Sequence, residues 1–341
     1  MNKIINKALF YKEWINVRWI TLLTIVILLF FKVYGFISIL NENERYMNHQ
    51  GGFNNNVWFN NGLYVMQAYY YVMIFVVILL AIILFAGDKN SETQGFIASM
   101  PFTRKEIILN KWIIGVLSLL ISFIISYILF SLFYVVNINV LNTALNPYSD
   151  IAKWFFMDTL QYVCIFTFMV LAQAVMGNSV VSGIVGGLIL IVPWFITMVI
   201  QDLFMRDHNL SDYTYSIFGN IGDWSNIYSY NLAVRNGLIT DPPYYYNYYG
   251  LKLLVLFILT FLFLYLAYVS FKKRNLEYNL SLIVFKNLEL VFVWGFAVCL
   301  GVFAGFASDC DLNLSFILFV VFTIIGYFIS KLLLKIFSTA K

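Results

Sequence analysis

Runs of about 20 apolar residues follow one another along most of the chain and constrain its fold more than any other feature. An α-helix of that length crosses a hydrocarbon core about 30 Å thick. Composition agrees, because 62% of the residues are hydrophobic and 11% are charged, whereas a soluble domain usually has about 25% charged residues. A transmembrane β-barrel would show alternating segments of about 10 residues instead. The sequence therefore predicts an all-α, polytopic helical membrane protein.

We expect about eight transmembrane helices, an even number that places both termini on one side. Their expected positions are residues 17–40, 63–86, 112–136, 154–176, 180–200, 251–271, 290–307 and 315–334. Most of the 21 basic residues lie on the terminal side: Lys3, Lys7, Lys12, Arg18, Lys89, Arg104, Lys105, Lys111, Lys272, Lys273, Arg274, Lys286, Lys331, Lys335 and Lys341. The opposite loops hold Arg45, Lys153, Arg206, Arg235 and Lys252. Basic residues are enriched in cytoplasmic loops, so both termini are predicted to be cytoplasmic. The formal net charge of +4 is concentrated in a few loops, so it carries topological information and does not indicate nucleic-acid binding.

The segment before the first span is amphipathic. Its sequence, NKALFYKEWINVRWI, covers residues 6–20 and places apolar side chains at roughly helical spacing with Lys7, Lys12, Glu13 and Arg18 between them. Two interpretations have equal weight: an N-terminal interfacial helix, or an extension of the first span. No small-residue cleavage site follows the span, so we expect it to be retained.

The main polar interruption of the first half is GDKNSETQGFIASMPFTRKEIILNKW, residues 87–112. Ser91 with Gln94, and Thr103 with Glu106, match the capping-box pattern that starts helices. Pro101 separates the two patterns, and proline breaks a helix. We therefore expect a short amphipathic helix at about 92–98, then a second helix that begins near Thr103 and runs through Lys111 into the third span. Such a helix-break-helix offers a cytoplasmic docking surface to a soluble partner.

This run resembles the cytoplasmic region between the second and third spans of ABC-2 type transporter permeases. An acidic residue, a glycine, a small-residue–proline break, a basic residue and a later lysine recur there, matched here by Glu92, Gly95, Pro101, Arg104 and Lys111. The resemblance implies that segment 87–111 contains a short coupling helix docked on a cytoplasmic ATPase. The residues expected to contact that ATPase are Ser91, Glu92, Gly95, Phe96, Pro101, Arg104 and Lys105.

The resemblance covers residues 1–277, a permease transmembrane domain of six spans with an external loop at 201–250. Residues 278–341 form an additional two-span C-terminal hairpin, and this eight-span layout is more similar to the Ytr-like branch of Gram-positive bacteria. The resemblance implies a bacterial cytoplasmic membrane protein that pairs with itself or a sister permease. With two ATPase subunits it would export a lipid, a peptide or a hydrophobic small molecule.

The sequence contains no Gly-x-x-x-x-Gly-Lys-Ser/Thr loop to hold nucleotide phosphates. We therefore expect no cofactor in this chain, with ATP and Mg²⁺ bound by the partner ATPase. Catalytic motifs such as Gly-x-Ser-x-Gly and His-Glu-x-x-His are also missing. His49 and His208 lack metal-ligand spacing. The chain is not expected to be an enzyme.

Two glycine pairs and two ionisable residues stand out within the spans. Gly183 with Gly187, and Gly301 with Gly305, allow helices to approach closely and predict packing or dimer faces. Ionisable residues in lipid suggest a transport pathway or a charge pair, which makes Lys32 and Asp158 candidates. Alternatively, Asp158 lies in the headgroup layer and Lys32 extends toward it.

Two other functions remain open. An ATP-independent secondary transporter or channel would be expected to contain paired intramembrane charges or broken helices. A membrane scaffold or sensor would bind peptides through the external loop 201–250. The tyrosines at 244–249 could contact a substrate, but aromatic residues next to a span usually form the interfacial belt, which is our prediction for them.

Overall fold

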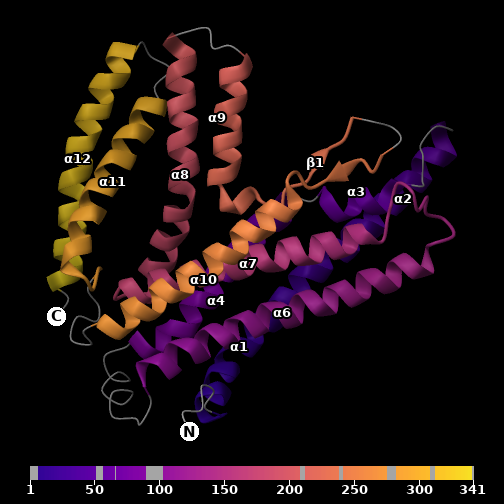
Figure 1. The fold of residues 1–341 in the computed structure, drawn as a ribbon, viewed down its shortest axis with the longest axis horizontal. Coiled ribbons are helices and arrows are strands. Elements are labelled where there is room, and N and C mark those ends of the chain that lie inside the picture. The colour runs from indigo at the N-terminus through magenta and orange to yellow at the C-terminus, as the bar shows by residue number, and fades with distance from the viewer. Residues whose placement is uncertain are drawn as a thin grey trace. The chain divides into compact units, whose positions relative to one another are not determined.

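The computed structural model describes residues 7–50, 57–65, 67–89, 103–207, 212–237, 241–274, 282–307 and 312–339. Figure 1 shows that these residues are almost entirely helical, apart from one small ribbon of two strands. Eight of the described helical segments are long and apolar enough to cross a membrane. The prediction of a polytopic helical membrane protein is confirmed.

The first span is longer than the predicted apolar run. Helix α1 (Lys7–Leu28) continues through a π-helical turn (Leu29–Val33) into α2 (Tyr34–Gln50). The amphipathic segment is thus the beginning of α1, as in the second of our two interpretations. No proline or glycine interrupts α1, and its buried acidic residue, Glu13, has a basic partner.

The other helices follow the predicted spans closely, with one addition before the sixth span. They are α3 (Trp58–Tyr64), α4 (Gln67–Lys89), α6 (Arg104–Val136), α7 (Ser149–Val175), α8 (Ser179–Asp207), α9 (Asp212–Ser225), α10 (Tyr249–Lys273), α11 (Lys286–Ala307) and α12 (Leu312–Thr339). Strands β1 (Val234–Arg235) and β2 (Tyr244–Tyr245) pair antiparallel.

The chain divides into two compact units. The first contains Met1–Leu84, Glu106–Thr167 and Tyr230–Leu264. Its spans are joined by polar bonds within the apolar core: Thr21 and Ser118 share a hydroxyl hydrogen bond of 2.7 Å between α1 and α6. Trp112 of α6 donates from its indole nitrogen to the hydroxyl oxygen of Thr167 on α7, at 2.8 Å. These bonds fix the relative rotation of three spans.

The second unit contains Phe85–Lys105, Phe168–Ser229 and Tyr265–Lys341. Its α11 and α12 run antiparallel, side by side (Figure 1). Gly301 allows this close approach, because a Cβ there would lie 2.7 Å from the backbone oxygen of Phe319. The predicted two-span hairpin therefore exists, but it falls in the same unit as α8 and α9. The domain boundary predicted between residues 277 and 278 stays a prediction.

Residues 201–250 were expected to form an external loop, yet they contain α9. This helix packs against α8 (Figure 1). After α9 comes a 3-10 turn (Ile227–Ser229), where the hydroxyl of Tyr228 donates to the carbonyl oxygen of Gly187 at 3.0 Å. Gly187 lies in the first half of α8. The segment after α8 therefore packs back along that helix as far as Gly187. That residues 201–250 lie outside the cell stays a prediction.

Candidate functional site

The structure describes both flanks of the predicted coupling segment. The candidates Ser91, Glu92, Gly95, Phe96 and Pro101, and the short helix expected at 92–98, lie outside the described residues. On one flank, α4 ends at Lys89. On the other, α6 begins at Arg104 and continues through the third span, which confirms the second helix expected from Thr103.

The N-terminal flank is held by Lys89, whose side chain is buried. Its ammonium group donates to the side-chain oxygen of Gln173 at 2.6 Å and to the backbone oxygen of Met176 at 2.9 Å. Both acceptors lie at the end of α7 or in the turn that follows it. A buried cation is costly unless polar groups surround it, so these acceptors fix the end of α4.

Arg104 holds the C-terminal flank. Its guanidinium donates to the backbone oxygen of Lys272 at 3.0 Å and to that of Arg274 at 2.5 Å. The last carbonyls of a helix lack partners within it, and a cation there also favours the helix dipole. Arg104 thus caps the C-terminal end of α10. The neighbouring Lys105 is exposed. Contact of either residue with an ATPase stays a prediction.

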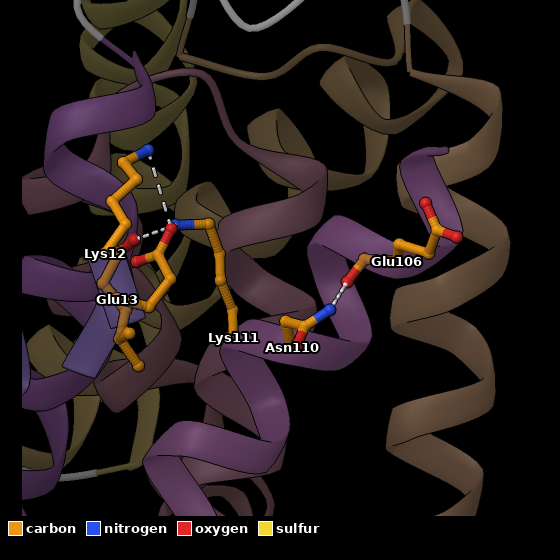
Figure 2. Close-up of polar contacts among 6 residues, drawn as sticks. Lys12, Glu13, Glu106, Asn110 and Lys111 are labelled. Atoms are coloured by element: carbon orange, nitrogen blue, oxygen red, sulfur yellow. Dashed lines mark hydrogen bonds and ion pairs between the residues drawn. The ribbon is translucent and has the colours of Figure 1, made fainter. Parts of the chain in front are cut away.

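Lys111, the last match to the permease pattern, forms a buried ion pair with Glu13 in the first unit. The two charged groups are 2.9 Å apart, and each side chain is 1% exposed. Figure 2 shows the Glu13 carboxylate between the amino groups of Lys111 and Lys12, the latter 3.7 Å away. Lys111 also donates to the backbone oxygen of Leu84. It therefore joins α1 and the end of α4 to α6.

The structure brings the two intramembrane candidates together. Lys32 lies in the π-helical turn, Asp158 lies on α7, and both are 0% exposed. The Lys32 ammonium donates to the backbone oxygen of Leu63 at 2.5 Å and lies 4.5 Å from the centre of the Tyr69 ring. The Tyr69 hydroxyl donates to Asp158 at 2.9 Å, so this tyrosine contacts both charged groups. Neither side chain extends to the surface of the chain. The depth of the pair relative to the lipid headgroups stays a prediction.

Asn231, shortly after the 3-10 turn, also belongs to the polar cluster formed by Lys32, Tyr69 and Asp158. Its side-chain oxygen accepts a bond from Gln161 at 3.0 Å, and its amide donates to the hydroxyl of Tyr162 at 3.3 Å. All three side chains are completely buried. Sequence reasoning missed Asn231 because a single asparagine in a polar loop carries no signal of its own.

The predicted packing glycines lie on buried faces. Gly301 faces Thr323 and Phe319, and a Cβ at Gly305 would lie 3.3 Å from the backbone oxygen of Ser315. Both contacts join α11 to α12 within one chain. Gly183 and Gly187 are also buried in α8. Whether any of these four residues also lies at a dimer face stays a prediction.

The tyrosines at 244–249 are only partly exposed. The backbone amide of Tyr244 donates to the side chain of Asn60 at 3.0 Å. Tyr246 is buried and packs edge to face on Tyr64, with ring centres 5.1 Å apart. Burial raises the pKa of Tyr246, which keeps its phenol neutral. The belt interpretation is therefore wrong for Tyr246, while Tyr245 and Tyr248 are exposed as it requires.

Among the residues that the structure describes, no group of three His, Cys, Asp or Glu side chains could hold a metal ion. The buried charges instead hold helices together: Lys111 with Glu13, Lys32 with the Leu63 carbonyl, Asp158 with Tyr69, and Lys89 with its amide and carbonyl acceptors.

Comparison with protein families shows to which family the chain belongs. The family model described as an ABC-2 family transporter protein matches residues 8–236, well over half of the chain. The chain belongs to the ABC-2 transporter family. This confirms the resemblance to ABC-2 type permeases. The Ytr-like branch and the coupling role of segment 87–111 stay predictions. A comparison with curated proteins finds no match. As an ABC transporter permease, the chain is a multi-pass membrane component that associates with ABC ATPase subunits.

Proposed function

We propose that this permease belongs to a bacterial exporter that carries a lipid, a peptide or a hydrophobic small molecule out of the cell. Separate ATPase subunits bind ATP and Mg²⁺ and dock on segment 87–111 from the cytoplasm. One observation carries the proposal: both flanks of this segment are bonded to other membrane helices, through Lys89 and Arg104. A push on the segment is therefore passed to the spans.

Each part of the chain has a defined task in this mechanism. Ser91, Glu92, Gly95, Phe96, Pro101, Arg104 and Lys105 form the ATPase contact. When the ATPases close on ATP, the segment moves and α6 carries the motion into the membrane as one continuous helix of 33 residues. The Lys111–Glu13 ion pair makes α1 move with α6. A second permease, identical or related, lines the path with this one, and both termini lie in the cytoplasm.

The test is co-purification of the ATPase with the permease in mild detergent. We expect Glu92→Lys and Phe96→Ala each to lower the recovered ATPase by about tenfold, since central contacts of an interface are often worth over 1 kcal/mol. Arg104 is not replaced, because loss of its bonds to the carbonyl oxygens of Lys272 and Arg274 would alter the permease itself. Arg235→Glu is the matched control: its side chain is exposed on β1, on the predicted outer side, and it should keep wild-type recovery. Full recovery from both variants would contradict the proposal.

The Lys32–Asp158 pair favours one alternative, an ATP-independent secondary transporter, because such proteins use paired intramembrane charges. The burial of both side chains supports a structural role instead. Flux through vesicles that contain the purified permease alone, without ATP or an ATPase, would establish the alternative.

A further inference from the structure

The turn between α7 and α8 receives bonds from several helix ends in the second unit, and Gln173 lies at their centre. Its side chain is completely buried. The side-chain oxygen accepts the bond from Lys89 at 2.6 Å, and the amide donates to the backbone oxygen of Ser179, the first residue of α8, at 2.9 Å. One amide group thus connects the end of α4 to the start of α8.

The backbone of Gln173 forms the connection to the other flank. Arg274 donates from its guanidinium to the carbonyl oxygen of Gln173 at 3.2 Å, and its own carbonyl accepts the bond from Arg104. Burial, with a smaller effect of the nearby Arg104, lowers the pKa of Arg274 to about 10. Arg274 therefore stays charged at neutral pH. The bonds run from Arg104 through Arg274 to Gln173.

The same turn holds the segment that leads into the C-terminal hairpin. The amide of Val284 donates to the backbone oxygen of Val175 at 3.0 Å. Met176 packs in a buried apolar cluster with Leu282 and Ile283. The residues just before α11 therefore follow the turn if it moves.

We propose that Gln173 is the positioning residue that passes movement of the segment between Lys89 and Arg104 to α8. This inference rests on the proposed function, in which an ATPase moves that segment. Lys89 and Arg104 are its two described ends, and each is connected to Gln173 by the bonds above. Lys89 is buried, so separating its ammonium from its acceptors would leave polar groups unpaired at a high free-energy cost. The turn must then move with α4, and the amide of Gln173 moves Ser179 with it.

The experiment measures movement of α8 and needs no transported substrate. Cys164, Cys299 and Cys310 are replaced by serine, and a cysteine is introduced at Gln201, half-buried near the outer end of α8. A maleimide then labels this position in the permease–ATPase complex, with and without ATP, Mg²⁺ and vanadate. We expect the two labelling rates to differ in the parent protein. Gln173→Leu should bring their ratio at least about fivefold closer to one, the size of a typical coupling effect, with unchanged ATPase recovery.

Gln173→Leu removes an acceptor from the buried Lys89, so it could disturb folding as well as the transmission of movement. A second variant distinguishes the two effects. The double variant Lys89→Met with Gln173→Leu leaves no charge there and should fold, bind the ATPase and still lack the response. Gln161→Leu is the matched control, since Gln161 is a completely buried glutamine of the same helix that bonds to Asn231 instead. It should keep the response.

A wild-type ratio in the double variant would overturn the inference, as would loss of the response in Gln161→Leu or a parent ratio of one. If no ATPase co-purifies with the unaltered permease, the proposed function fails, and this inference fails with it. If the ATPase is recovered and only the response is wrong, the fault lies with the role of Gln173 alone.

Discussion

At the scale of single residues, two buried charges of the first unit, Lys32 and Asp158, lie on either side of one tyrosine. Lys32 and Asp158 stood out because ionisable residues are rare in apolar runs, but their pairing depends on how α7 packs against the first span. Tyr69 contacts both groups: its ring lies against the ammonium and its hydroxyl bonds to the carboxylate. The sequence contains no signal for that arrangement, because helix rotation and depth are set by packing.

Removing one member of this pair should destabilise the protein more than removing both. Breaking a buried ion pair costs about 3–5 kcal/mol, whereas replacing both partners by apolar groups is often nearly neutral. We expect Lys32→Met and Asp158→Asn to lower the melting temperature of the detergent-purified protein, and the double variant Lys32→Met with Asp158→Leu to recover most of the loss. Lys153→Met is the control, because the side chain of Lys153 is 47% exposed. This variant should leave the melting temperature unchanged. Equal losses in the single and double variants would show that the pair is not coupled.

At the scale of elements, apolar length was sufficient to locate the spans but not to find α9. Its sequence, DYTYSIFGNIGDWS, contains two glycines and several Asp, Asn and Ser residues, all typical of turns. The helix packs on α8 where Gly222 lies against Trp194 and Thr197, while Ile217 and Ile221 stay exposed. This is a tertiary contact that local propensity does not capture. The helix that begins at Arg104 was predictable because proline and a capping pattern define its start locally. The sequence left two interpretations open for the segment before the first span. It could not show that Glu13 is buried there, because its partner Lys111 lies on a distant helix.

The α11–α12 hairpin offers a direct test of helix approach. At Gly301, a Cβ would lie 2.7 Å from the backbone oxygen of Phe319, which cannot move aside as a side chain can. Gly301→Ala should therefore lower the free energy of unfolding by about 1–3 kcal/mol, the usual cost of overpacking. Gly295→Ala, on the same helix with nothing within 4 Å of its Cβ, should have little effect. Thermal unfolding measures the stability of both variants. If Gly301→Ala is as stable as Gly295→Ala, the close packing of α11 on α12 is contradicted.

At the scale of the whole molecule, the eight spans and the distribution of basic residues predict how the chain crosses the membrane. Cysteines introduced at Lys105 and Arg235 test this orientation, since both positions are exposed. With the native cysteines replaced, we expect a membrane-impermeant maleimide to label Arg235→Cys in intact cells. Lys105→Cys should react only after the membrane is opened. The reverse pattern would place the termini outside and would also make cytoplasmic ATPase docking on segment 87–111 impossible.

The position of Lys32 has a further consequence for biogenesis. A ribosome makes the chain from its N-terminus, so the first span reaches the translocon before the helix that carries Asp158 has been synthesised. A lysine near the middle of a span costs about 2.5–3.5 kcal/mol on translocon insertion scales, and at that stage no carboxylate is present to offset it. The groups that surround Lys32 in the folded chain come from helices made later: the Leu63 carbonyl, the Tyr69 ring and, bonded to Tyr69, Asp158. The cost is therefore offset only as those helices join the first span.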